Sequence, residues 1–280
     1  MILGDAGYGL IFLLITIIGR ITIRKAPAEP FLLLLITSIT TIIWGAMTGN
    51  WFGVEALSQN SLFSLMIVPK IASFAAAEGT DKLIMHLCFI MGGVHLSVAH
   101  LMNFIRFFPS LKAFSELGWL SVLWGLYFVI RTLVLKLPQH PLSMWLLGGG
   151  ILLVIVFSEQ TGKFFTGLKK GFGNIILIAL NSIGFFSDIV SYVRLFAVGL
   201  ATLEVAKSFN AMASGMGDGV AAIIISSLIL FFGHALNIIL GCMSLIVHGV
   251  RLNMLEFSGH LNMEWSGNEY KPFKKREEKS

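Results

Sequence analysis

Charged residues are scarce in this sequence. Asp, Glu, Lys and Arg together make up 12% of the 280 residues, against about 25% in soluble domains. Apolar residues make up 56% before the 29 glycines are counted, and the mean hydropathy is +0.83. A soluble globule of this size could not bury so much apolar surface in one core. The composition excludes an ordinary soluble enzyme and a disordered chain, and indicates a protein that crosses a membrane several times.

Cysteine is almost absent as well. Cys88 and Cys242 both lie inside apolar runs, so we expect neither a disulfide framework nor a zinc site. The sequence contains no Walker loop, no HExxH and no CxxC motif. The net charge of +5 is not accompanied by an aromatic and basic patch. We therefore expect no metal, no cofactor and no nucleic-acid partner.

Seven apolar segments are candidates for crossing the bilayer, which takes roughly 20 helical residues. They cover residues 9–23, 31–52, 83–108, 117–137, 142–157, 174–213 and 220–257. Because a backbone in lipid must satisfy its own hydrogen bonds, each segment is predicted to be a helix. The first and fifth are short, whereas the last two exceed the bilayer thickness. We predict an all-α polytopic membrane helix bundle, a single membrane domain over residues 1–280, with two long tilted C-terminal helices.

The distribution of basic residues predicts the orientation of these segments. If the loop at 21–30 is cytoplasmic, the alternation places thirteen basic residues on the cytoplasmic side and five on the other. This excess satisfies the positive-inside rule and predicts a cytoplasmic C-terminus, with the charged tail 271–280 in solvent. The loop at 54–82 is the longest polar excursion and is expected on the outer face.

The last segment carries a regular polar stripe. As a helix, residues 220–257 would measure about 57 Å. Spacings of 3, 4, 3, 4 and 3 place six polar or small residues on one helical face. These residues are His234, Asn237, Gly241, Ser244, His248 and Arg251. A polar stripe at the level of the lipid must face protein or water, so it is a candidate functional surface.

Arg194 lies near the middle of the preceding segment, where no other charge separates Asp188 from Glu204. Centring an Arg in a membrane costs about 2.5–3.5 kcal/mol on insertion scales, and a guanidinium cannot lose its proton in a protein. Arg194 therefore needs a carboxylate or water. Ser191, almost one turn earlier, and the flanking Asp188 and Glu204 are further candidates for an ion path.

Structural explanations compete with these functional ones. Arg194 could pair with Asp188, although a separation of six residues puts the two on different helical faces. Arg251 lies nearer a helix end, from which its side chain could extend to the cytoplasmic interface. Histidines on apolar faces often serve packing alone. That alternative applies to His86, His95, His100, His234 and His248.

One motif identifies a resemblance. Residues 191–201, SYVRLFAVGLA, resemble the "SYLRLxALxLA" signature of the membrane stator subunit of V/A-type ATPases, called subunit a in eukaryotes and subunit I in prokaryotes. The glycine-rich stretch 4–9 resembles the turn between that family's first two membrane helices. Residues 45–53 resemble its "GxxxGxxFG" run, whose glycines are typical of close helix packing. The residues of the arginine motif resemble those of prokaryotic members more than those of eukaryotic ones.

The resemblance implies a function. In that family the subunit lies against a rotating ring of small subunits that each carry a membrane carboxylate, and two offset half-channels lead ions to and from it. By resemblance, Arg194 is the essential arginine that faces the ring, Arg251 is its partner, and the assembly transports H⁺ or Na⁺ while ATP is made or hydrolysed. The implied partners are the ring, the peripheral and central stalk subunits and the lipid bilayer, in a prokaryotic cell membrane.

The sequence departs from the family in three respects. Thr202 stands where eukaryotic members carry a His, and Gly241 stands where they carry an acid. His234, Asn237, Ser244 and His248 are therefore the half-channel candidates, with Asp188, Ser191 and Glu204 as weaker ones. The family's cytoplasmic arm and first helix have no counterpart, which suggests a fragment, a split gene or a misplaced start. A self-contained secondary cation transporter is the alternative function, although the two repeated halves typical of such transporters are not visible.

Overall fold

The structure is a computed structural model that describes residues 3–23, 27–74, 79–160, 164–217, 219–263 and 266–267. The predicted cytoplasmic tail 271–280 and three of the basic residues used for the orientation, Arg24, Lys25 and Lys163, lie outside the described residues.

The described residues are helical and contain no strand. The principal helices are α1 (Ala6–Thr22), α2 (Ala28–Thr48), α5 (Thr80–Phe107), α6 (Ala113–Leu135), α7 (Leu142–Phe157), α8 (Phe164–Gly173), α9 (Ile175–Ser191), α10 (Val193–Ser214) and α11 (Val220–Ser244). Two π-helical segments, Leu245–Gly249 and Leu252–Phe257, and the short α12 (Ser258–His260) continue α11. The polar excursion after α2 holds the short helices α3 (Glu55–Ser58) and α4 (Ser61–Ser64) and a 3₁₀ turn at Pro69–Ile71. The all-α prediction is confirmed.

Five helical stretches in the described part of the chain are long and apolar enough to cross a membrane. They are Ala28–Thr48, Thr80–Phe107, Ala113–Leu135, Ile175–Ser214 and Val220–His260. Ala6–Thr22 and Leu142–Phe157 are shorter apolar helices. These seven helices correspond to the seven predicted segments, and the two longest are at the C-terminal end, as the sequence predicts. That all seven cross the bilayer stays a prediction.

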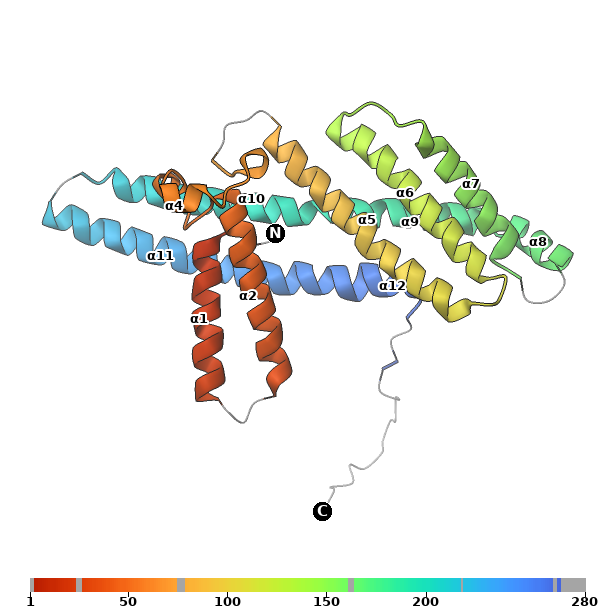
Figure 1. Cartoon of the computed structure of the whole chain (residues 1–280), viewed down its shortest axis with the longest axis horizontal. Helices are drawn as coiled ribbons and strands as arrows, with labels where there is room; N and C mark the ends of the chain where they lie inside the picture. The colour runs from red at the N-terminus through yellow and green to blue at the C-terminus, as the bar shows by residue number, and fades with distance from the viewer. Residues whose placement is uncertain are drawn as a thin grey trace, which may run out of the picture.

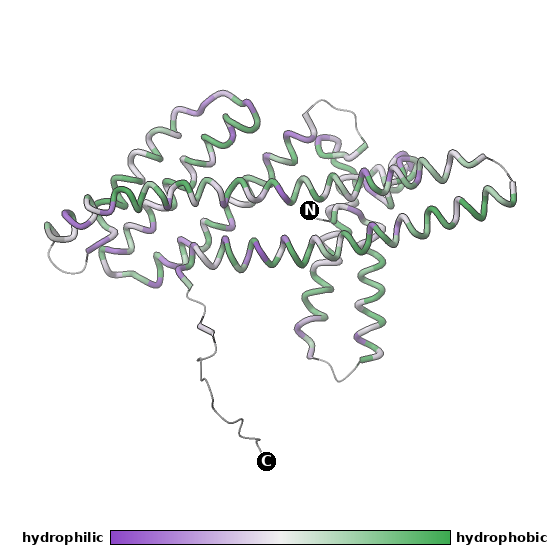
Figure 2. The backbone as a smooth tube through the Cα atoms, turned by 180° about the vertical axis from the view of Figure 1, so that it is seen from behind, coloured by the Kyte–Doolittle hydropathy of each residue, from purple (hydrophilic) through white to green (hydrophobic). Residues whose placement is uncertain are grey.

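The two long C-terminal stretches organise the molecule. In Figure 1, α9–α10 and α11–α12 run along its longest dimension, while the α1–α2 hairpin projects across them. Helices α5, α6 and α7 pack against one another over α9, and α10 packs on α11. Figure 2 shows apolar residues along most of α1, α2 and α11, with polar residues interspersed on the long helices. The main buried cluster lies where α5, α6, α9 and α10 meet, and includes Phe89, Leu96 and Leu123.

A group of hydrogen bonds to the Asp5 side chain fixes the start of α1. Asp5 is the N-cap, and its Oδ1 accepts hydrogen bonds from the backbone N–H groups of Gly7, Tyr8 and Phe52, at 2.8, 3.2 and 3.0 Å. Burial raises the pKa of Asp5 to about 6, although those backbone donors act in the opposite direction. Gly45 packs directly on the backbone of Asp5, since a Cβ there would overlap it. Close packing by this glycine run is therefore confirmed at Gly45.

The next two glycines of that run are also closely packed, since a Cβ at Gly49 would come within 2.8 Å of Ile67 and one at Gly53 within 2.6 Å of Ala206. Gly49 ends α2 in the left-handed conformation, with φ of 71°, and Gly53 has φ of 68° in the following turn. Both serve the change of chain direction that returns Phe52 to the start of α1.

The predicted continuous helices 174–213 and 220–257 are both interrupted. The first breaks at Tyr192, where the backbone N–H groups of Tyr192 and Leu195 bond to carbonyls three residues earlier, at 3.2 and 3.1 Å. The second changes to π-helix at Leu245. A π turn inserts one residue into the helical repeat, so the regular stripe spacing cannot keep one face beyond that point. This effect of helix geometry corrects the prediction that all six stripe residues share a face.

Candidate functional site

Arg194 lies two residues after the break between α9 and α10. Its side chain is half-buried, and its Nη1 atom is buried with no hydrogen-bond partner among the described residues. No ion pair joins it to a carboxylate in the described part of the chain. The alternative in which Asp188 neutralises Arg194 is therefore wrong, because Asp188 has another partner.

His248 and Arg251 lie on the π-helical continuation of α11. The charges of both Arg194 and Arg251 act on His248, whose Nδ1 atom is buried and has no partner among the described residues. The Arg251 side chain is 54% exposed, and its Nε lies 3.6 Å from Oε1 of the buried Glu256. These three cationic or titratable groups thus gather where both long helices are irregular, and π turns often mark functional sites.

Asp188 belongs to a chain of four titratable side chains from four helices. Its Oδ2 is 3.0 Å from His260 Nε2, and His260 Nδ1 is 2.9 Å from His100 Nε2. His100 Nδ1 is 2.8 Å from Glu116 Oε2. His100, Glu116 and His260 are buried, whereas Asp188 is about one-third exposed. Asn103 Nδ2 donates to the carbonyl of His260 at 2.8 Å and holds α12 against α5.

The exposed end of this chain opens into a cavity of about 210 Å³, called here the Asp188 cavity. Its lining includes Asn181, Asp188, Glu256, Gly259 and His260. Glu256 Oε2 is buried there without a partner among the described residues. The Asp188 cavity therefore brings together two carboxylates and the terminus of a buried imidazole chain.

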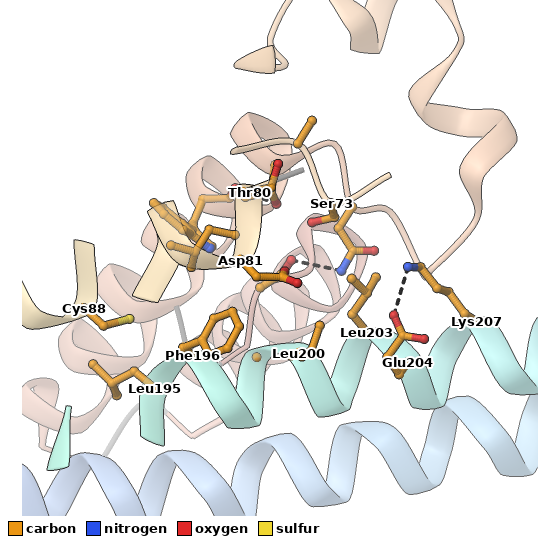
Figure 3. Close-up of a pocket in the computed structure, with 18 residues that line it drawn as sticks. Ser73, Thr80, Asp81, Cys88, Leu195, Phe196, Leu200, Leu203, Glu204 and Lys207 are labelled. Atoms are coloured by element: carbon orange, nitrogen blue, oxygen red, sulfur yellow. Dashed lines mark hydrogen bonds and ion pairs between the residues drawn. The ribbon is translucent and has the colours of Figure 1, made fainter. Parts of the chain in front are cut away.

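A second cavity, called here the Glu204 cavity, has a volume of about 410 Å³. It lies between α2, the start of α5 and α10, and Asp81 and Glu204 approach it from α5 and α10 (Figure 3). Glu204 pairs with Lys207 at 3.0 Å. Lys207 also lies over the Phe74 ring, 5.0 Å from its centroid, at the edge of the cavity.

The first half of the stripe contacts α1 and α10. Tyr8 Oη lies 2.6 Å from His234 Nδ1 and accepts a hydrogen bond from Asn237 Nδ2 at 3.1 Å. Asn237 is fully buried and also donates to the carbonyl of Thr202 at 2.8 Å. Gly241 packs on Leu3, with which a Cβ would collide.

The predicted candidates therefore separate into groups. Arg194, His248 and Arg251 come together, whereas His234 and Asn237 form a different site with Tyr8. Asp188 and Glu204 each line a cavity. Ser191 donates to the carbonyl of Ser187 at 3.0 Å, and Ser244 is half-buried on α11 without a role in either cavity.

Sequence reasoning missed most of the polar network. Tyr8, Asp81, Glu116, Glu256 and His260 were not among the candidates, and for His100 packing was the favoured alternative to a proton-carrying role. Their partners lie up to 229 residues away in the chain, so local spacing could not connect them. The one available signal was the presence of lone ionisable residues in apolar helices, which favours function by itself.

Comparisons with known proteins give the family. The chain matches no protein-family profile. It is 40% identical to the V-type ATP synthase subunit I of Borreliella burgdorferi, over 98% of this chain and 47% of the relative. It is 34% identical to V-type ATP synthase subunit I 1 of Treponema pallidum, over 99% and 45%. It is also 26% identical to the A-type ATP synthase subunit I of Methanocaldococcus jannaschii, over 99% and 43%. The chain is homologous to V- and A-type ATP synthase subunit I.

The homology extends over part of subunit I only, because the chain spans about half the length of the curated relatives it matches. The subunit I names and the apolar helices together make this a membrane protein related to rotary ATPases. The resemblance seen in the arginine motif is thus confirmed at the level of the family.

Proposed function

We propose that this subunit I homologue forms the ion-translocating membrane part of a rotary V/A-type ATPase stator, with Arg194 as the residue that faces the rotating ring. A permanent cation in a low-dielectric site strongly favours the ionised form of a passing carboxylate. Arg194 would therefore displace the ion bound to each ring carboxylate and block a direct leak. Its half-buried guanidinium, with no carboxylate partner in the described part of the chain, supports this role.

The two cavities are proposed as the half-channels. Helix α5 passes both cavities. Its residue Asp81 lines the Glu204 cavity. Its residue His100 is hydrogen-bonded to His260, which lines the Asp188 cavity. Nineteen residues of helix between Asp81 and His100 correspond to about 28 Å, close to the roughly 30 Å of hydrocarbon in a bilayer. The cavities thus lie near opposite ends of one helix, as two half-channels require. By the positive-inside orientation, the Asp188 cavity is the cytoplasmic one.

The buried chain from Glu116 to Asp188 is proposed as a proton path into the Asp188 cavity. Each of its three hydrogen bonds joins groups that can either donate or accept. With Glu116 protonated, it donates to His100, His100 donates to His260, and His260 donates to the Asp188 carboxylate. If one proton crosses each bond in the same direction, Glu116 becomes a carboxylate and Asp188 becomes protonated. The chain thus transfers one proton over four helices and leaves each imidazole with its proton on the other ring nitrogen, so both rings must turn over before the next proton can pass.

The remaining parts of the proposal concern setting and partners. The implied partners are a ring of small membrane subunits with buried carboxylates, the peripheral and central stalk subunits and the lipid bilayer. The proposed location is a prokaryotic cell membrane, crossed by all seven apolar helices, with the C-terminus in the cytoplasm. A membrane potential would then drive each ion along the path with about 2.3 kcal/mol per charge per 100 mV.

Arg194, which pairs with no carboxylate among the described residues, carries the proposal, and its replacement tests it. In the assembled ATPase, Arg194→Ala should reduce ATP-driven ion transport to background while assembly remains near normal. Arg131→Ala is a matched control, because Arg131 Nε is also buried without a partner in the described part of the chain, while Arg131 lies on α6 and lines neither cavity. Retained transport in Arg194→Ala would contradict the proposal. Transport by the purified chain alone in liposomes would favour the secondary transporter.

A further inference from the structure

His95 is one side chain that contacts both long helices. It lies on α5, and its Nδ1 atom is 2.7 Å from the hydroxyl oxygen of Tyr192. The imidazole of His95 also stacks on the ring of Phe257, with 4.5 Å between the ring centroids and 5° between the ring planes. Tyr192 belongs to the α9–α10 junction and Phe257 to the continuation of α11.

Tyr192 is the residue at which α9 changes into α10. It is only 3% exposed, and its ring lies directly on the backbone of α5, since a Cβ at Gly92 would come within 2.7 Å of it. Arg194 follows two residues later. The direction of the Arg194 side chain therefore depends on how the chain leaves the break, and the hydroxyl of Tyr192 is held there by His95.

Phe257 occupies the corresponding place on the other long helix. It ends the π-helical segment Leu252–Phe257, which begins immediately after Arg251. The preceding residue, Glu256, is the ion-pair partner of Arg251. Because π turns are rare and appear mostly as single inserted turns, an external contact that fixes the end of one also fixes the rotation of its side chains.

We propose that His95 is a positioning residue for the two arginines, which holds the Tyr192 break and the Phe257 π turn in one relative arrangement. This inference rests on the proposed function of Arg194. His95 itself faces neither cavity. It acts through Tyr192 and Phe257, and so sets the separation of Arg194 and Arg251 along the ring-facing surface.

Three substitutions separate the two contacts of His95. His95→Phe keeps a flat ring for Phe257 but removes the bond to Tyr192, and Tyr192→Phe removes only the hydroxyl. His95→Asn keeps a polar atom near the position of Nδ1 but removes the stacked ring. The matched control is His86→Phe with Tyr127→Phe, because His86 Nε2 makes a similar 2.6 Å bond to the Tyr127 hydroxyl between α5 and α6. That pair touches neither long helix through its bond.

The measurement is the number of ions transported per ATP hydrolysed by the reconstituted complex, together with its passive ion leak and its assembly yield. We expect His95→Phe and Tyr192→Phe to change the ratio of coupled to leaked ions by roughly fivefold, the population change that follows loss of one ordinary hydrogen bond. His95→Asn, which loses the stacked ring instead, should change the ratio by a similar factor of about two to ten. His95→Phe combined with Tyr192→Phe should be no worse than either alone. The His86 and Tyr127 variants should leave the ratio unchanged.

A purely structural role for His95 would lower assembly yield and leave that ratio at its original value, which would overturn the inference. If His95→Phe fails to assemble, Tyr192→Phe, which removes a single atom, decides the question by the same ratio. Failure of the proposed function would be recognised separately, because Arg194→Ala would then still transport ions.

Discussion

The polar side chains in the two halves of the last long helix differ in their hydrogen bonding. In Val220–Ser244, a regular α-helix, His234 and Asn237 are bonded to Tyr8 and Thr202, and Asn237 Oδ1 is the one buried side-chain polar atom without a partner among the described residues. Beyond Leu245 the helix becomes π-helical, and His248 Nδ1 is buried without a partner in the described residues. Arg251 there extends outward, 54% exposed.

This difference predicts a structural role for the first half of the helix and a role in transport for the second. Polar groups that bond to their own chain fix the packing of α1, α10 and α11. Polar groups that stay incompletely bonded must find water or another protein at the level of the lipid. Substitutions in the first half should therefore change stability, and those in the second half should change transport.

Among substitutions in this last long helix and its contacts, the largest effect is expected for Arg251→Ala. Its loss leaves Glu256 as a buried carboxylate without its cation, beside the Asp188 cavity. Because such an uncompensated charge is costly, ion transport by the assembled complex should fall by a factor of about ten to a hundred. Arg251→Lys, which keeps the charge, should lose less. Full transport in Arg251→Ala would instead mean that Arg251 only extends to the membrane interface.

Asp5→Asn should change how stability depends on pH. The pKa of Asp5 rises from 3.8 when unfolded to about 6 in the folded protein, so the native state holds this proton to higher pH. The contribution to stability is fully present below pH 3.8 and is lost as the pH rises to about 6. The loss amounts to up to about 3 kcal/mol. Unfolding in detergent should show this fall in the unsubstituted chain and none in Asp5→Asn, whereas equal pH profiles would contradict it.

Asn237→Leu should destabilise the first half. The substitution removes the two hydrogen bonds that Asn237 donates, to the Tyr8 hydroxyl and to the Thr202 carbonyl. We expect a loss of about 2 kcal/mol in the free energy of unfolding. Ser244→Ala, on the same helix, is the control and should change little. A transport defect in Asn237→Leu without any loss of stability would assign this half to the ion path.

The smallest effect is expected for Tyr8→Phe. Only the hydroxyl that bonds His234 and Asn237 is lost, while the ring keeps its edge contact with Phe52. The expected cost is about 1 kcal/mol, seen as a lower Tm with coupling unchanged. An altered ion-to-ATP ratio in this variant would remove the distinction between the two halves.

The sequence predicts the parts of this structure that depend on local pattern. Apolar runs predict where the helices lie. The uncharged stretch around Arg194 indicates that this arginine is functional, and the polar stripe indicates His248 and Arg251 as further candidates. The break at Tyr192 is not visible in sequence, because it depends on contact with Gly92 and His95 in another helix. The chain from Glu116 to Asp188 is invisible for the same reason, since it joins four helices. The inserted π residues also change which residues share a face, and spacing alone assumes a regular helix.

The most direct test of the account asks what the Arg194 side of α10 faces. Ala197 and Ala201 lie about one and two turns beyond Arg194 and are exposed. In a complex whose native Cys88 and Cys242 are replaced, Ala197→Cys and Ala201→Cys should form oxidative crosslinks with a cysteine placed beside the ring carboxylate. Ile18→Cys, on the exposed side of the α1–α2 hairpin, should not. Crosslinks from Ile18 and none from Ala197 or Ala201 would contradict the assignment of Arg194 to the ring-facing surface.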